Sequence, residues 1–369
     1  MKKFIYKIYQ NDGTYIGTLP VRLPTVPDRT QILPVNLPSI TSEINNGQGS
    51  LTIETNQKFD DFGEGGIIDH NNIVKLYVWD SMNHTTPVLI YTGIILTYIP
   101  FISGGNEGVK IQCVGRSHEL STGYYTSGGN YDFNKNQKAS AIFQDIITNF
   151  QAVYAASDIA YTGASVEDST TVLNLDFSKK KWKEAIDEVL KIAPAGWWWS
   201  IEPDGTANFK SKPSFATHTF NLRKNCEKIE VNKSMESVIN NVIVSSSAPA
   251  TPHTASDATS ISAYGDRRKY ITDTQIQDNT TAQARADKEV ADNKDIKRRT
   301  TITINSTYDI ESIKVGETCK ILNYDDSGSL LDSNMRIVRI QYNGMTAQLT
   351  LEDNFQDLNK NLKNFILNN

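Results

Sequence analysis

The chain has 369 residues, of which 38% are hydrophobic and 9% aromatic, and its formal net charge at pH 7 is −5. A chain of this length is expected to form two or more domains, and its apolar content excludes general disorder. The acidic balance gives no overall attraction to nucleic acid or to an anionic membrane surface.

The N-terminal third has the pattern of a β-rich unit. Residues 4–9 and 15–19 flank Asp12-Gly13, so the chain is expected to open with a hairpin. Further extended segments are EINNGQGSLTIET, NIVKLYVWDS, VLIYTGIILTYIP and EGVKIQCVGRSHELS, which begin at residues 43, 72, 88 and 107. An acidic, glycine-rich stretch at residues 59–68 separates the first two of these segments.

The longest uncharged stretch, residues 88–102, is predicted to be a strand. It is shorter than the roughly 20 apolar residues that a spanning helix needs, and it contains Gly93, Pro100 and many β-branched residues. Lys2 and Lys3 precede only a short apolar trio, which does not make a signal peptide. The protein is therefore expected to be made in a cytoplasm without export, and to have no stable membrane insertion.

The middle of the chain predicts a small α/β unit. Two amphipathic helices are marked by apolar stripes, one from Ala139 to Phe150 and one from Trp182 to Ala193. Ser178 is expected to cap the second helix, and Pro194 with Gly196 to end it. A hairpin around Asp204-Gly205 is expected to follow.

The C-terminal part predicts a second β-rich unit that a long polar excursion interrupts. Strand patterns lie at 237–247, 301–321 and 335–353, and Asn343-Gly344 is expected to supply two positive-φ residues of a tight turn. Within the excursion, a short helix is predicted near 281–293, with Ala282, Ala286 and Val290 facing its sheet. Residues 245–262, rich in Ser, Thr, Ala and Pro, are expected to form a mobile loop.

The order and spacing of these segments resemble those of the baseplate hub, or tail-associated (tail tip), proteins of tailed bacteriophages. At the N-terminal end the resemblance lies in acidic, glycine-rich loops followed by KLYVWDS, YTGII and KIQCVG. At the C-terminal end it lies in a strand that breaks off for the excursion and returns to finish the sheet. These are strand and turn patterns rather than catalytic signatures, and together they cover most of the chain.

The resemblance implies a mainly β fold with an α+β insertion. Two tail-tube-like β-barrel or sandwich domains are expected at 1–122 and 213–355, with a smaller α/β insertion domain at 123–212. The second β domain is expected to carry an inserted loop and helix at about 248–296. Residues 356–369 are expected to form a short tail, without the C-terminal lytic extension that many such proteins have.

The resemblance also implies a structural role in the virion rather than an enzymatic one. Three chains would form a homotrimer that joins the six-fold tail tube to the three-fold tip and forms part of the DNA-exit channel. The implied partners are the distal tail protein or tail tube ring, the tape measure protein, and tip or receptor-binding proteins. Genomic DNA would meet the protein only in transit, during DNA ejection and host entry.

The Trp197-Trp198-Trp199 run is a candidate ligand platform, because aromatic rings stack on sugars and bases. On a strand, Trp197 and Trp199 share one face and Trp198 lies on the other. At least one face must meet the neighbouring helix, so core packing or a subunit contact is the expected role.

Three short basic clusters are candidates for phosphate contact. Apart from Trp182, which belongs to a helix stripe, they lack interleaved aromatic residues. They are therefore expected to be solvated faces or subunit salt bridges. The clusters are Lys179, Lys180, Lys181 and Lys183; Arg267, Arg268 and Lys269; and Lys297, Arg298 and Arg299.

No compact catalytic or metal-binding motif is present in the sequence. Ser178 and Lys181 match a fragment of the penicillin-binding-protein signature, but the partner SDN and KTG elements are missing. The three cysteines are odd in number and far apart, and two lie in strand patterns, so they are expected to be buried hydrophobes. They are Cys113, Cys226 and Cys319.

The spacing of several acidic residues and of the histidines does not match a catalytic or metal-binding site. Neighbouring carboxylates in a glycine-rich loop usually cap turns rather than cleave glycosides, and the second acidic loop lacks EF-hand spacing. We therefore expect no catalytic, cofactor-binding or metal-binding residue and no cofactor. The residues in question are Asp60, Asp61 and Glu64; Asp325, Asp326 and Asp332; and His70, His84, His118, His218 and His253.

Two other classes of protein stay open on sequence alone. A tail-associated peptidoglycan or glycan hydrolase would need catalytic motifs that the sequence lacks. A carbohydrate-binding adhesin would use the tryptophan run.

Overall fold

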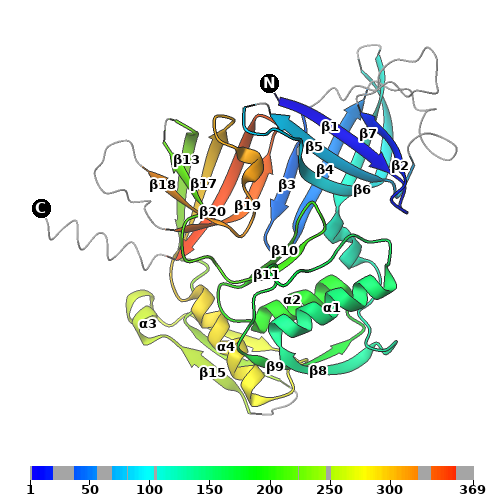
Figure 1. The fold of residues 1–369 in the computed structure, drawn as a ribbon. Coiled ribbons are helices and arrows are strands. Elements are labelled where there is room, and N and C mark those ends of the chain that lie inside the picture. The colour runs from blue at the N-terminus through cyan, green and yellow to red at the C-terminus, as the bar shows by residue number, and fades with distance from the viewer. Residues whose placement is uncertain are drawn as a thin grey trace, which may run out of the picture.

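The computed structural model describes residues 2–19, 37–55, 69–80, 82–103, 106–222, 224–246, 251–322 and 334–354. A broad β layer occupies one side of the molecule, and a smaller unit with the longer helices packs beneath it (Figure 1). The fold is mainly β with an α+β insertion, as predicted.

Seven strands of the β layer come from the N-terminal third. Their order in the sheet is β3-β4-β7-β6-β5-β1-β2, and every neighbouring pair is antiparallel. The predicted opening hairpin is confirmed as β1 and β2, and the uncharged stretch is confirmed as β6. The strands are β1 (Lys2–Tyr9), β2 (Tyr15–Leu19), β3 (Ile40–Glu43), β4 (Gly47–Thr55), β5 (Ile73–Asp80), β6 (Val88–Ser103) and β7 (Asn106–Gly115).

Six strands from the C-terminal half continue the same sheet. Their order is β13-β17-β20-β19, with β18 also on β19 and β12 parallel to β18. A short 3-10 helix, η3 (Ile310–Ser312), precedes β18. The strands are β12 (His218–Asn221), β13 (Cys226–Ser234), β17 (Lys297–Asn305), β18 (Thr318–Leu322), β19 (Met335–Tyr342) and β20 (Thr346–Asn354).

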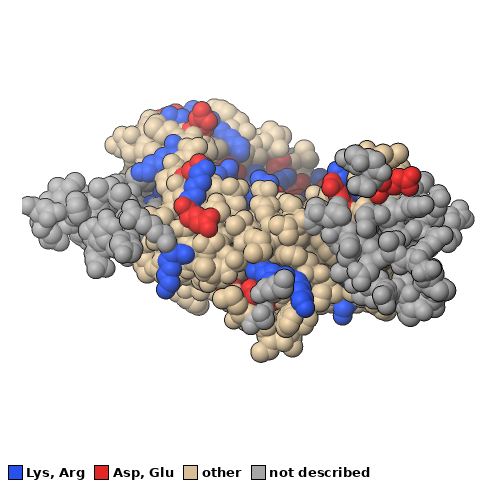
Figure 2. Space-filling view, turned by 90° about the horizontal axis from the view of Figure 1, so that it is seen from above, with Lys and Arg blue, Asp and Glu red and all other residues tan. Residues whose placement is uncertain are grey.

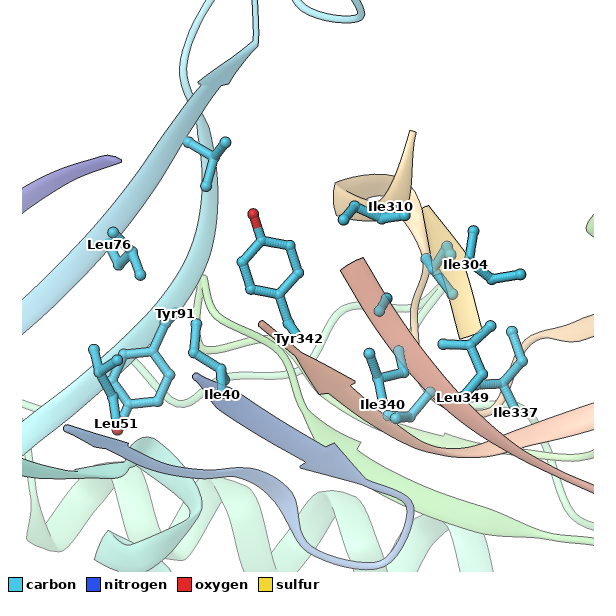
Figure 3. Packing of buried hydrophobic residues seen from close by; sticks show 14 of the residues in the cluster. Ile40, Leu51, Leu76, Tyr91, Ile304, Ile310, Ile337, Ile340, Tyr342 and Leu349 are labelled. Carbon is cyan, nitrogen blue, oxygen red and sulfur yellow. The ribbon is translucent and has the colours of Figure 1, made fainter. Parts of the chain in front are cut away.

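The two halves of the layer are joined by one strand pair. Strand β19 lies antiparallel to β3, with Tyr342 opposite Ile40 and Arg339 opposite Glu43. The result is a single sheet of 13 strands. Buried residues of both halves form one hydrophobic cluster. In Figure 3, Tyr342 lies between Leu76 of the N-terminal half and Ile304 of the C-terminal half.

The predicted alternation in β20 is confirmed, whereas its turn differs from the prediction. Ala347, Leu349 and Leu351 are fully buried, as a half-buried strand requires. Three residues link β19 to β20, and only Gly344 among them has a positive φ, 74°. Asn343 keeps a negative φ because a three-residue loop needs a single left-handed position.

The α/β unit is built from two separate segments of the chain. Its buried residues form a second hydrophobic cluster, which runs from Leu120 to Val290. The first segment contributes η2 (Arg116–Ser121), β8 (Asp132–Lys138), α1 (Ala139–Val153), β9 (Val172–Ser178), α2 (Trp182–Ile192), β10 (Trp198–Ile201) and β11 (Ala207–Lys210). The second contributes β14 (Asn241–Ser245), β15 (His253–Ser256), α3 (Ala258–Tyr264), β16 (Arg268–Thr272) and α4 (Asn279–Asn293).

Both predicted central helices and the short later helix are confirmed. The apolar stripes of α1 and α2 lie in the second cluster together with Ala282, Ala286 and Val290 of α4. Helix α4 thus packs in the α/β unit, beside α2, rather than on the sheet of 13 strands. The domain boundaries at residues 122, 212 and 355 stay a prediction.

Two local predictions are wrong. Ser178 does not cap α2, because the chain turns at Lys179, which has a φ of 49°, and the helix begins only at Trp182. Ser178 is instead the last residue of β9, and its hydroxyl donates a hydrogen bond to Asp132. The predicted mobile loop forms β15 and α3, apart from residues 247–250, which lie outside the described residues. Pairing of β15 with β14 and the Asp257 cap of Ser260 N–H satisfy its backbone.

The α/β unit docks on the β layer through the hairpin of β10 and β11, which lies between the two in Figure 1. Asn45, in the turn between β3 and β4, bonds Trp199 twice: its N–H donates to the Trp199 carbonyl at 2.7 Å, and its Oδ1 accepts from Trp199 N–H at 3.1 Å. On the other side, the Trp198 ring lies where a side chain at Gly316 would be, because a Cβ there would meet Trp198 Cζ2 at 2.1 Å.

Replacing Gly316 by alanine is expected to loosen this docking. Gly316 (φ 84°) and Gly13 (φ 87°) both have a positive φ, where alanine costs about 1 to 2 kcal/mol. A Cβ at Gly13 meets nothing within 4 Å. Gly316→Ala should therefore destabilise the protein by about 1 to 3 kcal/mol more than Gly13→Ala, through overpacking against Trp198. Denaturant unfolding of the two variants measures the difference, and equal costs would show that Trp198 does not press on this site.

Candidate functional site

The candidate site is a junction where three parts of the fold meet. It lies between the β3, β4 and β6 strands of one half of the sheet, η3 and β19 of the other half, and the end of β10 in the α/β unit. A cavity of about 260 Å³ opens there. Its apolar wall includes Ile40, Ile90, Ile201 and Ile340, and its charged wall includes Glu202, Glu311 and Lys314.

Glu202 places a buried carboxyl group at one side of the cavity. Its Oε1 accepts hydrogen bonds from Asn208 Nδ2 at 3.2 Å and Ser200 Oγ at 3.3 Å. Its Oε2 lies 3.5 Å from Lys314 Nζ, across the junction. Burial raises the pKa of Glu202, and the charge of Lys314 only partly opposes that shift.

Glu311 forms the centre of a second polar group, at the other side. Its Oε1 accepts from Lys2 Nζ and from Tyr342 OH, both at 2.8 Å, so β1, η3 and β19 are linked. The side chain of Glu311 is fully buried, and Oε2 has no hydrogen-bond partner among the described residues. Burial, followed by the charge of Glu311, raises the pKa of Tyr342, so the phenol stays protonated and donates.

His84 and Asp309 complete this group. His84, in the loop between β5 and β6, has Nε2 2.8 Å from Asp309 Oδ1, and Asp309 immediately precedes η3. Ligand atoms of His84, Asp309 and Glu311 all lie within 4.8 Å of one another. This group offers an imidazole and two carboxylates, which can act as metal ligands. It does not offer an activated nucleophile, because the hydroxyl that bonds Glu311 is the Tyr342 phenol, whose pKa is raised.

Trp198 and Trp199 are buried and Trp197 is half-buried, in agreement with the predicted packing role of the tryptophan run. Trp199 is fully buried and its Nε1 donates to Asp187 Oδ1 at 3.0 Å, while Trp197 packs on Phe209 with ring centroids 4.9 Å apart. Both contact the second hydrophobic cluster, whereas Trp198 faces Gly316. The run is therefore packing and docking surface in this chain.

Each basic cluster has at least one residue that is bonded to or buried in the chain itself, and the three clusters do not form one basic surface. In the first, Lys183 donates to Asn46 Oδ1 at 2.7 Å; in the second, Lys269 pairs with Glu289 at 2.7 Å. In the third, Arg298 is only 2% exposed. Figure 2 shows basic and acidic side chains interleaved over the face seen from above.

The other predicted candidates do not come together. The acidic residues 60, 61, 64, 325, 326 and 332 lie outside the described residues. Ser178 bonds Asp132, and Lys181 begins the turn of α2, where its N–H donates to Glu184. The three cysteines are buried and free, and burial raises the pKa of Cys113 to about 12.

Sequence reasoning missed the meeting of His84 with Asp309 and Glu311. The three residues are brought together by the pairing of β19 with β3, and 225 positions separate His84 from Asp309. No local spacing signals such a contact. Of the described helices, none combines the length and the apolar character that crossing a membrane requires.

Solved structures with this architecture are known. The 43 kDa tail protein of prophage MuSo2 from Shewanella oneidensis matches with a TM-score of 0.62 and 12% identity, over 95% of this chain and 98% of that one. A tail protein from Neisseria meningitidis MC58 matches with a TM-score of 0.63 and 13% identity, over 95% and 97%. The chain has the fold of phage tail proteins.

A chain of another protein complex also has this fold. A chain of the Francisella PdpA–VgrG complex, in its half-lidded form, matches with a TM-score of 0.55 and 9% identity. That match covers 96% of the present chain but 58% of the other. Neither a family model nor a curated protein matches the sequence.

Truncating Trp199 to alanine is expected to destabilise the fold without a separate loss of glycan binding. Removing a fully buried indole costs about 3 to 5 kcal/mol. Trp79→Ala, at a half-buried position of β5, should cost less. Chemical unfolding and a glycan array on both variants test this. A Trp199→Ala protein of normal stability that loses binding to host glycans would identify a ligand platform instead.

Glu202→Gln is expected to stabilise the protein at neutral pH. The pKa of Glu202 is raised in the folded state, so its contribution to stability is lost as pH rises through that folded-state value. The variant's advantage should therefore be present at pH 7 and shrink toward about pH 4, near the ordinary glutamate pKa. Glu230→Gln, at an exposed carboxylate paired with Lys228, serves as the control and should show little pH dependence. Free energies of unfolding measured across this pH range test the prediction. An advantage of Glu202→Gln that persists at pH 4 would show that the pKa of Glu202 is not raised by burial.

Proposed function

We propose that the protein is a structural baseplate hub, or tail tip, protein of a tailed phage or phage-like particle. The observation that carries the proposal is the whole-length agreement of fold with prophage tail proteins. It covers 95% of this chain and nearly all of each of those two, so the α/β unit is included with the β layer. As a structural element, the protein is proposed to have no enzymatic activity.

A homotrimeric ring is the proposed assembly, and the open edges of the sheet support it. Among the strands that the structure describes, neither β2 nor β13 has a partner on its outer side. Most residues of β13 are exposed. Unpaired strand edges are normally covered by another chain, and a head-to-tail contact between two different edges closes into a ring when the rotation allows.

The distal part of β6 offers an apolar contact surface for a second copy of the chain. Leu96 and Ile99 are each 41% exposed, and Ile102 is 76% exposed. The register partners of Ile99 and Ile102 on β7 are Lys110 and Glu107, so the two side chains lie on opposite faces of the sheet. Ile102, the most exposed of the three, is the proposed point of contact with a second copy.

Within the particle, the ring is proposed to join the six-fold tail tube to the three-fold tip and to form part of the DNA-exit channel. The net charge of −5 fits a channel through which DNA passes without binding. The proposed neighbours are the distal tail protein or tube ring, the tape measure protein, and tip or receptor-binding proteins. Synthesis is proposed in the host cytoplasm and residence in the virion.

The assembly proposal predicts a particle of three times the chain mass of 41.2 kDa. Ile102→Glu would place a charge in the proposed contact, where an unpaired buried charge is strongly unfavourable, and should weaken association at least about tenfold. Tyr270→Glu, at a 69% exposed aromatic residue of β16, is the matched control and should leave the mass unchanged. Mass photometry over a concentration series measures both.

Two results would count against this proposal. A wild-type protein that stays monomeric at particle-like concentration, together with non-trimeric density in labelled tails, would overturn the trimer. Clearing of host peptidoglycan in a zymogram would favour the hydrolase class instead.

A further inference from the structure

We propose that His84, Asp309 and Glu311 form a divalent transition-metal site that clamps the two halves of the β layer together. The three ligand atoms come from the loop between β5 and β6 and from the segment around η3. The first belongs to the N-terminal half of the sheet and the second to the C-terminal half. The site lies beside the junction cavity, which Glu311 lines.

The geometry is close to what one ion needs. The three ligand atoms lie within 4.8 Å of one another. Two ligand atoms of one tetrahedral ion, each bound at about 2.0 to 2.2 Å, are about 3.3 to 3.6 Å apart. Closing the group around an ion therefore needs the longest separation between ligand atoms to shorten by about 1 to 1.5 Å.

The buried state of Glu311 is the second, independent observation. Its side chain is fully buried and one oxygen, Oε1, is already used by Lys2 and Tyr342. The other oxygen, Oε2, is buried without a hydrogen-bond partner among the described residues. A buried carboxylate oxygen normally has a partner, because desolvating it is costly. A cation held with Asp309 and His84 would supply that partner.

The local charge balance also favours a cation. Lys2 is the cation bound to Glu311, and Asp309 adds a second carboxylate to the group. The two carboxylates together carry one more negative charge than Lys2 balances. Lys2 holds Oε1 from the β1 side and leaves Oε2 for a second cation.

The donor set indicates the class of metal. One imidazole nitrogen with two carboxylate oxygens suits Zn²⁺ and its first-row neighbours, whereas Ca²⁺ and Mg²⁺ prefer oxygen ligands alone. The bond from His84 to Asp309 would be replaced by two bonds to the ion. The cavity beside Glu311 leaves room for water to complete the coordination.

The test uses the full chain, purified without a polyhistidine tag and freed of metal with a chelator. Calorimetric titration with Zn²⁺ is expected to give one ion per chain, and Co²⁺ should give visible absorption in the same ratio. His84→Ala and Asp309→Asn should each weaken Zn²⁺ binding at least about tenfold. His118→Ala, at an exposed histidine away from the group, is the control and should bind as the wild type does.

Thermal unfolding gives an independent readout of the clamp. Saturating Zn²⁺ should raise the midpoint of the wild type and of His118→Ala by a few degrees, and should not raise that of His84→Ala. The inference is overturned if the wild type binds no Zn²⁺, or if His84→Ala and Asp309→Asn bind it unchanged. It is also overturned if Ca²⁺ binds in preference to Zn²⁺ and equally well to His84→Ala. These outcomes are independent of whether the protein is a trimer.

Discussion

The antiparallel pairing of β19 with β3 is the constraint on which the rest of the structure depends. It makes one sheet from strands that come from the two ends of the chain, and it lets the apolar faces of both halves share one hydrophobic cluster. Tyr342 sits at this join, buried among side chains of both halves while its hydroxyl reaches Glu311. Separating the halves would expose that cluster and leave the Lys2, Glu311 and Tyr342 group without its partners.

The α/β unit depends on the same join, although its core is separate. Its second segment leaves the β layer after β13 and returns to it at β17, two strands that are paired with each other. Both ends of this segment are therefore fixed by the pairing of β13 with β17. Asn45 and Gly316, one from each half of the layer, then fix the β10 hairpin from opposite sides. The hairpin is thus positioned by two hydrogen bonds to Asn45 on one side and by the Trp198 ring against Gly316 on the other.

The sequence predicted those elements whose signal is local. The apolar stripes of α1 and α2, the alternation in β20 and the interior position of Trp199 all follow from periodicity over a few turns or residues. Prediction from sequence failed where contacts with distant parts of the chain override the local signal. The Ser-rich segment before Tyr264 has little to bury, yet β14 and the Asp257 cap order it. The meeting of His84 with Asp309 could not be predicted, because no spacing encodes a contact made by distant strands.

The distance along the chain between β3 and β19 also bears on how the protein is made. Ile40 leaves the ribosome about 300 residues before its partner Tyr342. At typical elongation rates of about 5 to 20 residues per second, β3 waits for tens of seconds with one edge unpaired. During that interval the apolar face of the N-terminal half lacks the side chains that cover it in the finished sheet. The pairing of β19 with β3 can therefore form only after residue 342 has been synthesised.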